Sequence, residues 1–137
     1  MKKMPRIEAV MTPLPHTIGH DIPIEKAREM MRDYHVRHLP VYDSGRLVGI
    51  LSDRDIKLAS SFPQFATFQV EDVMTPDPFC VPADAPLDQV LTQMVAHKYG
   101  CALVGQPRGR ILGIFTAVDA LEFLSQILKL YYSSEEN

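Results

Sequence analysis

The chain has 137 residues, of which 46% are hydrophobic and 23% charged, as is usual for one globular domain with a sizeable core. Its formal net charge of -3 disfavours a general binder of nucleic acid or anionic membranes, because such proteins need a basic surface. No apolar run approaches the roughly 18 residues of a membrane span, so a cytoplasmic protein is predicted. Cys80 and Cys101 are expected to be free, buried thiols in a reducing compartment, and a disulfide is the less favoured alternative.

Taken in chain order, the sequence repeats itself. Val-Met-Thr-Pro, Asp-x-Pro and Gly-Ile-x-[Ser/Thr]-x-x-Asp each occur twice, in the same order. The recurring segments are 10–13 with 73–76, 21–23 with 84–86, and 49–55 with 113–119. The offset is 63 residues for the first two pairs and 64 for the third, so one residue is added in a turn, where insertions are tolerated. The chain is therefore predicted to hold two copies of one structural unit.

Each copy is expected to open with a short extended segment, at 16–18 and at 79–81. The Asp-x-Pro that follows predicts a helix start, with Asp as the cap and Pro in the first turn. Apolar residues at helical spacing then predict the buried face of each helix. These residues are Ile24, Ala27, Met31 and Tyr34 in the first copy, and Leu87, Val90, Leu91, Met94 and Val95 in the second. A β-hairpin is predicted next, at 39–51 and at 101–115, followed by a closing helix.

The order strand, helix, strand, strand, helix in each copy predicts an α+β fold of two pseudo-symmetric repeats. The small sheets are expected to pack together under helices, because one copy alone would leave a sheet face bare. The predicted domains are 1–61 for the first repeat, 62–69 for a linker, 70–132 for the second repeat with an extended C-terminal helix, and 133–137 for a disordered tail. In the linker, Phe62, Phe65 and Phe68 are expected to pack on the body of the protein.

The C-terminal helix, expected from Thr116 to about Tyr131, is apolar over more of its circumference than one core stripe requires. A helix of this kind needs a second surface on which to bury its apolar side chains. A homodimer is the simplest way to supply that surface.

The junction between each hairpin and its closing helix carries the residues that invite ligand chemistry. Ser52 with Asp55, and Thr116 with Asp119, have the spacing of a helix capping box. A strand that runs into a helix start leaves backbone N–H groups and the positive end of the helix dipole at the junction, which suits a phosphate. Three basic residues lie near the first junction in sequence: Arg37, His38 and Arg54. The simpler alternative is that both pairs cap their helices and do nothing more.

At this point the sequence resembles a tandem pair of CBS domains, also called a Bateman module. The resemblance rests on the two Val-Met-Thr-Pro segments, on 36–41 (Val-Arg-His-Leu-Pro-Val), and on the two Gly-Ile-x-[Ser/Thr]-x-x-Asp segments. The resemblance covers the chain from Ile7 to about Leu130. The chain as a whole looks like one of the standalone bacterial CBS-pair proteins. The resemblance implies a non-catalytic sensor that binds AMP, ADP, ATP or S-adenosylmethionine between the repeats, dimerises, and signals to an unidentified protein partner. No cofactor is required.

The resemblance also implies two ligand sites, in which the closing Asp of each copy accepts hydrogen bonds from ribose hydroxyls. The Asp55 site would comprise Ser52, Arg54, Asp55, Arg37 and His38, with Thr75, Phe79, Tyr99 and Gly100 lent by the second repeat. The Asp119 site would comprise Thr116 and Asp119 with Thr12, His16, Thr17, Val36 and Arg37. The second copy departs from the first because Ala117 and Val118 replace Asp53 and Arg54. A polyphosphate is therefore expected to prefer the Asp55 site.

Other functions are less well supported by the residues. A structural dimerisation module with empty clefts is the main alternative, and a nucleic-acid binder is disfavoured by the negative net charge. His35 and His38 have helical spacing but no acidic or cysteine partner nearby, so no metal site is expected. No nucleophile with a base and an orienting group is recognisable, so catalysis is not expected.

Overall fold

The computed structural model describes residues 2–132, in two compact units. The Asp55 unit is formed by residues 14–78 and 106–111. The Asp119 unit is formed by residues 1–13, 79–105 and 112–137, as far as these are described. The predicted disordered tail, 133–137, lies outside the described residues. None of the helices within 2–132 is long and apolar enough to cross a membrane.

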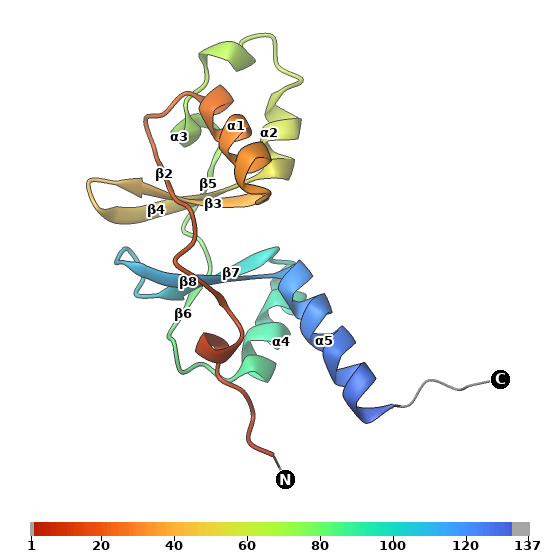
Figure 1. Ribbon diagram of the computed structural model, residues 1–137. Helices are drawn as coiled ribbons and strands as arrows, with labels where there is room; N and C mark the ends of the chain where they lie inside the picture. Colours follow the sequence, from red (N-terminus) through yellow and green to blue (C-terminus); the bar gives the residue numbers. More distant parts are fainter. Residues whose placement is uncertain (1, 133–137) are drawn as a thin grey trace, which may run out of the picture. The chain divides into compact units, whose positions relative to one another are not determined.

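The Asp55 unit holds a four-stranded mixed sheet in the order β2-β3-β4-β5. Its strands are β2 (Ile18–Gly19), β3 (His38–Asp43), β4 (Arg46–Ser52) and β5 (Thr75–Pro76). β2 runs parallel to β3, whereas β3–β4 and β4–β5 are antiparallel. Helices α1 (Ile24–Tyr34), α2 (Asp53–Ala59) and α3 (Val70–Val73) cover one face of this sheet, and a 3-10 turn spans Phe65–Thr67 (Figure 1).

The Asp119 unit repeats this plan with a sheet in the order β1-β8-β7-β6. Its strands are β1 (Thr12–Pro13), β6 (Cys80–Val81), β7 (Cys101–Gly105) and β8 (Ile111–Thr116). Its helices are α4 (Leu87–His97) and α5 (Ala117–Tyr131), with a 3-10 turn at Ile7–Ala9 (Figure 1). The predicted α+β fold of two related repeats is therefore confirmed.

The Met-Thr-Pro segments form strands that are exchanged between the two copies. The family resemblance implied that each site takes a Met-Thr-Pro threonine from the other copy, but the strand pairing itself was not predicted. β5 of the second copy pairs with β4 of the first, and β1 of the first pairs with β8 of the second. Gly49 and Gly113 permit the close pairing. An added Cβ would lie 2.9 Å from the Thr75 carbonyl oxygen at Gly49, and 2.8 Å from the Thr12 carbonyl oxygen at Gly113.

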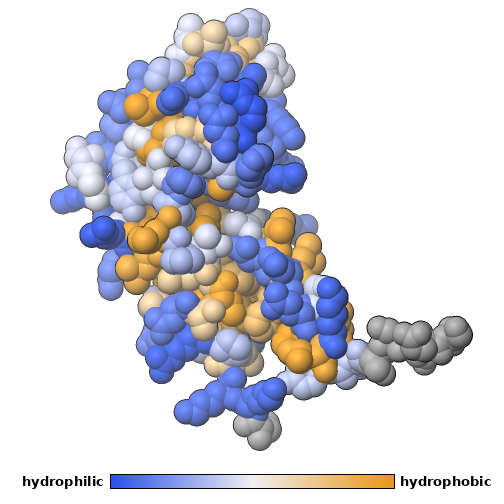
Figure 2. Space-filling model, in the orientation of Figure 1, coloured by the Kyte–Doolittle hydropathy of each residue, from blue (hydrophilic) through white to orange (hydrophobic). Residues whose placement is uncertain are grey.

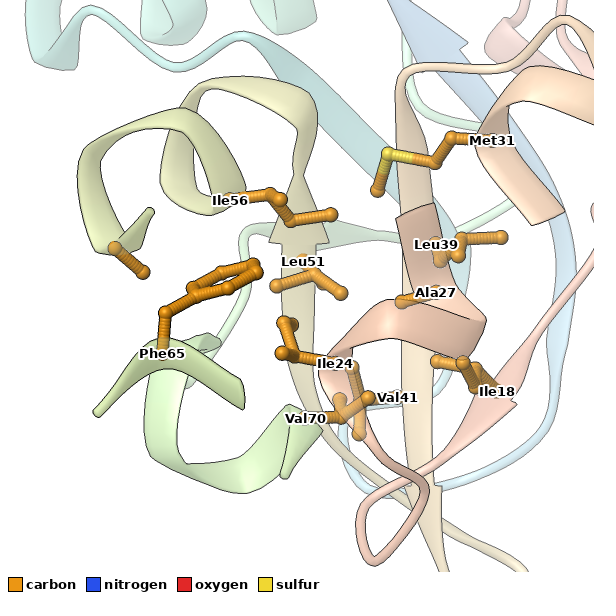
Figure 3. Packing of buried hydrophobic residues seen from close by; sticks show 11 residues of the cluster. Ile18, Ile24, Ala27, Met31, Leu39, Val41, Leu51, Ile56, Phe65 and Val70 are labelled. Carbon is orange, nitrogen blue, oxygen red and sulfur yellow. The ribbon is translucent and has the colours of Figure 1, made fainter. Parts of the chain in front are cut away.

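Each unit has its own apolar core between helices and sheet. In the Asp55 unit, Ile24, Leu39 and Leu51 are fully buried and share one apolar cluster with Phe65 from the linker (Figure 3). Burying an aliphatic or aromatic side chain of this size contributes about 1.5–3 kcal/mol. Met31 and Met94 are both 6% exposed, which confirms their predicted place on the buried helix faces. The cores explain why the helical stripes could be recognised from spacing alone.

Several local predictions are wrong, and each error has a physical reason. Tyr34 is 49% exposed because it ends α1 beside His35, which turns left-handed and directs the chain away. Val95 is 77% exposed because the buried face of α4 is formed by Leu87, Val90 and Met94, and Val95 lies outside that face. Phe62 is 54% exposed, although its ring meets that of Phe68 edge to face at a centroid distance of 6.3 Å.

The predicted aspartate caps are also wrong. Pro23 and Pro86 are the N-cap residues of α1 and α4, without a side-chain cap. The first amide of α1, on Ile24, donates instead to the Phe68 carbonyl, and that of α4 donates to the Pro5 carbonyl. Because backbone carbonyls satisfy these amides, the aspartates are not needed as caps. The extended segments are also shorter than predicted, at 18–19 and 80–81.

Candidate functional site

The first candidate corner lies where β4 passes into α2. Ser52 caps the helix with its Oγ, which accepts a 3.0 Å hydrogen bond from the Asp55 amide. The Ser52 amide in turn donates to Asp55 Oδ2 at 3.1 Å, which completes a reciprocal capping box. Both residues are half-buried, and the two hydrogen bonds hold the Asp55 carboxylate at the start of α2.

The second corner, between β8 and α5, has the same geometry. Thr116 Oγ1 accepts from the Asp119 amide at 3.1 Å, and the Thr116 amide donates to Asp119 Oδ2 at 2.9 Å. The similarity between the two corners includes the loop that contacts the start of each helix. The amide that follows the cap donates to a carbonyl at 2.9 Å in both corners, from Asp53 to Arg37 and from Ala117 to Gly100.

These bonds alter the expected phosphate chemistry. The sequence predicted unoccupied amides at each helix start, but the structure pairs the first amide with a loop carbonyl and the third with the cap hydroxyl. In α2, the Asp53 amide is occupied by Arg37 and the Asp55 amide by Ser52. A helix start whose first and third amides are already paired attracts an anion less strongly than one with all of its amides open.

The carboxylates keep acceptor capacity beyond the cap. An ionised carboxylate has two oxygens and about four acceptor positions. Each capping box accepts its hydrogen bond on Oδ2 of the aspartate, not on Oδ1. Each corner can therefore hold its own helix and still accept hydrogen bonds from a pair of hydroxyl groups.

The two corners differ in charge. Arg37 and Arg54 are exposed beside the Asp55 corner, and His38 is half-buried there. Lys57 forms a 3.0 Å ion pair with Asp53, so that acidic residue is partly neutralised. At the Asp119 corner the corresponding helix start has Ala117 and Val118. The positive charge that an anionic ligand needs is thus concentrated at the Asp55 corner.

The structure distributes the predicted site residues over both units. The Asp55 unit holds the corner residues Ser52, Arg54 and Asp55 together with Arg37, His38, Thr75, His16, Thr17 and Val36. The Asp119 unit holds Thr116 and Asp119 together with Thr12, Phe79, Tyr99 and Gly100. Thr75 pairs with Ile50 and Thr12 with Ile114, so strand exchange places a Met-Thr-Pro threonine in the same sheet as each corner.

Two stacked ring pairs accompany the corners. In the Asp119 unit, Phe79 and Tyr99 stack with centroids 4.8 Å apart and ring planes at 22°. In the Asp55 unit, His16 stacks on Tyr34 with centroids 3.8 Å apart and planes at 7°. Sequence reasoning missed Tyr34 because helical spacing assigned it to the core. The repeat offset, which aligns His16 with Phe79, was the signal for an aromatic pair in both copies.

An open groove of about 400 Å³ lies in the Asp119 unit, along β6 and the start of α4. Its walls are Phe79, Val81, Pro82, Asp84, Ala85, Pro86, Gln89, Val90 and Gln93. Neither Thr116 nor Asp119 lines it, so the groove and the Asp119 corner are separate features of this unit.

The cysteines are free and their environment disfavours thiolate chemistry. Burial raises the pKa of the Cys101 thiol to about 12, with a smaller contribution from Cys80. Burial also raises the pKa of the Cys80 thiol. Protonated thiols are poor nucleophiles and poor metal ligands. Within residues 2–132, no group of three His, Cys, Asp or Glu side chains could hold a metal ion.

Comparison with known proteins gives the family. An inosine-5'-monophosphate dehydrogenase of Methanocaldococcus jannaschii is 32% identical over 107 residues, covering 77% of this chain and 21% of that protein. The chain therefore spans about a fifth of the length of this relative. Among solved structures, AcuB from Vibrio cholerae is similar with a TM-score of 0.81 and 29% identity, over 98% of this chain and 100% of that one. CBSX2 in complex with AMP is similar with a TM-score of 0.77 and 26% identity, over 89% of this chain and 97% of that one.

The CBS domain family matches residues 7–61 and residues 70–126. These two spans contain both capping corners, both exchanged strands and both aromatic pairs. The chain belongs to the CBS domain family and carries two CBS domains in tandem.

Proposed function

We propose that this CBS pair is a non-catalytic regulatory module that binds an adenosine-containing ligand at the Asp55 corner and signals to a partner protein through a conformational change. The observation that carries the proposal is the Asp55 carboxylate, which its capping box fixes through Oδ2 alone. The similar protein CBSX2 was solved in complex with AMP, which supports the same class of ligand.

Magnitudes indicate which contacts must dominate such binding. Micromolar affinity requires about -8 kcal/mol. A hydrogen bond to a charged group contributes about 1.5–3 kcal/mol, whereas a helix terminus adds about 0.3–1 kcal/mol. A ribose diol on Asp55 and a buried adenine would therefore supply most of the affinity, and Arg37 and Arg54 would favour a phosphorylated ligand. AMP, ADP and ATP are thus favoured over S-adenosylmethionine.

The same proposal includes a homodimer formed through α5. No residue of α5 is fully buried. Ala120 and Phe123 pack against the core of the Asp119 unit, while a second apolar stripe remains exposed. The stripe comprises Leu121, Leu124, Leu128 and Tyr131, at spacings of three and four residues. This spacing is typical of helix pairs, and Figure 2 shows apolar side chains gathered along α5. A second copy of the chain would cover the stripe on both molecules.

Isothermal titration with AMP, ADP, ATP and S-adenosylmethionine tests the ligand directly. The variant Asp55→Asn is suited to this, because its carbonyl oxygen can keep the capping bond while its amide group cannot accept from ribose. Asp119→Asn is the matched control at the other corner. If no ligand releases heat or raises the melting temperature of ligand-free wild type, the sensor is excluded. The structural dimerisation module with empty clefts is then the better account.

A further inference from the structure

His20 joins three elements of the Asp55 unit at one point. Its Nδ1 lies 2.6 Å from Glu71 Oε2 on α3, and its Nε2 lies 3.2 Å from Asp43 Oδ1 at the end of β3. The backbone of His20 is used as well, since its amide donates to the Tyr42 carbonyl and its carbonyl accepts from the Glu71 amide, both at 2.9 Å. The ring is 27% exposed, so it can exchange protons with solvent.

Two carboxylates favour the charged form of His20: Glu71 shares a hydrogen bond with Nδ1, and Asp43 forms an ion pair with Nε2 when the ring is protonated. A neutral imidazole has one N–H and can donate to one carboxylate, whereas the imidazolium donates from both nitrogens. The hydrogen bond to Glu71 raises the pKa of His20 most strongly, burial lowers it in part, and the charges of Asp43, Glu71 and Asp21 each raise it by a smaller amount. These three carboxylates come from α3, from β3 and from the loop before α1.

The second copy shows that the fold does not need this histidine. Ala83 stands at the position of His20 and Glu8 at that of Glu71, each at the offset of 63 residues. The backbone bond is kept, because the Glu8 amide donates to the Ala83 carbonyl at 3.1 Å. Glu8 pairs instead with Arg6 at 3.6 Å, which stays charged near neutral pH. Of these two equivalent junctions, only the one in the Asp55 unit can respond to pH through a histidine.

α3 connects this junction to the candidate corner. Three residues separate Glu71 from Thr75 of β5, and Thr75 pairs with Ile50 of β4, two residues before Ser52. Loosening α3 would therefore loosen the edge strand that lies beside the Asp55 corner.

We propose that His20, Glu71 and Asp43 form a proton-controlled clasp that holds α3 and β5 against the rest of the Asp55 unit and opens as the pH rises. Because the pKa of His20 is raised on folding, the added stability is complete below the unfolded value near 6.5. It is lost as the pH climbs through the higher pKa of the folded state. Each unit by which folding raises the pKa of His20 corresponds to a tenfold preference of the proton for the folded chain.

The test uses full-length protein without ligand, so its outcome is independent of nucleotide binding. Urea unfolding and amide exchange in the β4–β5 ladder are measured between about pH 6 and pH 9 for wild type, His20→Gln and Glu71→Gln. We expect wild type to lose stability relative to His20→Gln as the pH rises, with faster exchange in β5. In an NMR titration, His20 should titrate above the ordinary histidine range, and Glu71→Gln should lower its midpoint.

Glu8→Gln is the control, because it changes the equivalent carboxylate where no histidine is present. The stability of Glu8→Gln should depend on pH in the same way as that of wild type. Parallel profiles for wild type and His20→Gln, or a His20 midpoint at the ordinary value, would overturn the clasp. A raised midpoint without any pH-dependent difference in β5 exchange would overturn its connection to the corner.

Discussion

Replacing Gly49 by alanine tests whether close strand exchange stabilises the Asp55 unit. The new Cβ would lie 2.6 Å from Met74 Sδ and 2.9 Å from the Thr75 carbonyl oxygen. The Met74 side chain can rotate away, but the carbonyl belongs to the β5 backbone and can move only if the β4–β5 pairing is disturbed. Overpacking of this kind costs about 1–3 kcal/mol. Alanine also restricts the unfolded chain and thereby regains about 0.4–1 kcal/mol, which leaves a net loss of about 1.3 kcal/mol at the midpoints of the two ranges.

Urea unfolding of Gly49→Ala measures this loss, and amide exchange locates it in β4 and β5. Gly113→Ala should behave similarly in the Asp119 unit, because its Cβ would lie 2.8 Å from the Thr12 carbonyl oxygen. Gly45→Ala separates sterics from backbone strain, since Gly45 has φ +79° and no atom within 4 Å of the added Cβ. If Gly49→Ala is as stable as wild type, with unchanged exchange in β5, the close contact does not determine the strand pairing.

Three further outcomes are expected. Asp55→Asn should weaken AMP binding by about 10- to 150-fold, the equivalent of one hydrogen bond to a charged group, whereas Asp119→Asn should change it less; equal effects would contradict the assignment of the ligand to the Asp55 corner. Leu124→Lys should convert the proposed dimer to a monomer in analytical ultracentrifugation, while Leu58→Lys on α2, where the leucine is 63% exposed against 50% for Leu124, should not; a dimer in both variants would exclude the α5 interface. Native Cys101, with its pKa raised to about 12, should resist alkylation at pH 8 and react only after unfolding; rapid labelling of the folded chain would show that burial does not protect it.

The parts of the fold that could be predicted from sequence are those fixed by short-range rules. The capping boxes join residues three apart, so Ser52 and Asp55 were enough to predict the first one. The buried helix faces follow from spacing, as at Ile24, Ala27 and Met31. The repeat added what neither rule gives, because a second copy of the same corner made an accidental match less plausible.

The strand exchange could not be predicted because it depends on contacts between distant segments. β1 and β5 have two residues each, too few for an alternating pattern to indicate a strand or its partner. The helix starts were mispredicted for a related reason. The amide of Ile24 is satisfied by the Phe68 carbonyl, 44 residues away, and nothing local in the Asp-x-Pro motif announces that partner. Sequence rules therefore fail here where a local polar group finds a non-local partner.

The differences between the copies indicate a division of tasks. The backbone plan is the same in both copies, so a side chain that is present in only one of them is not required for that plan. Basic side chains are concentrated in the Asp55 unit. The positions of His20, Arg37 and Arg54 correspond in the other copy to Ala83, Gly100 and Val118.

The helices of the two copies show the same contrast between charged and apolar surfaces. α1 of the Asp55 unit is lined by ion pairs on its exposed face, Lys26 with Glu29 and Arg28 with Glu25, and a charged face of this kind stays in solvent. α5 of the Asp119 unit instead exposes Leu121 and Leu124, which favour contact with another apolar surface. A ligand and a proton would thus act on one unit while association takes place on the other. Regulation of assembly would then require the two exchanged strands, because β1 and β5 are where each copy contributes to the sheet of the other.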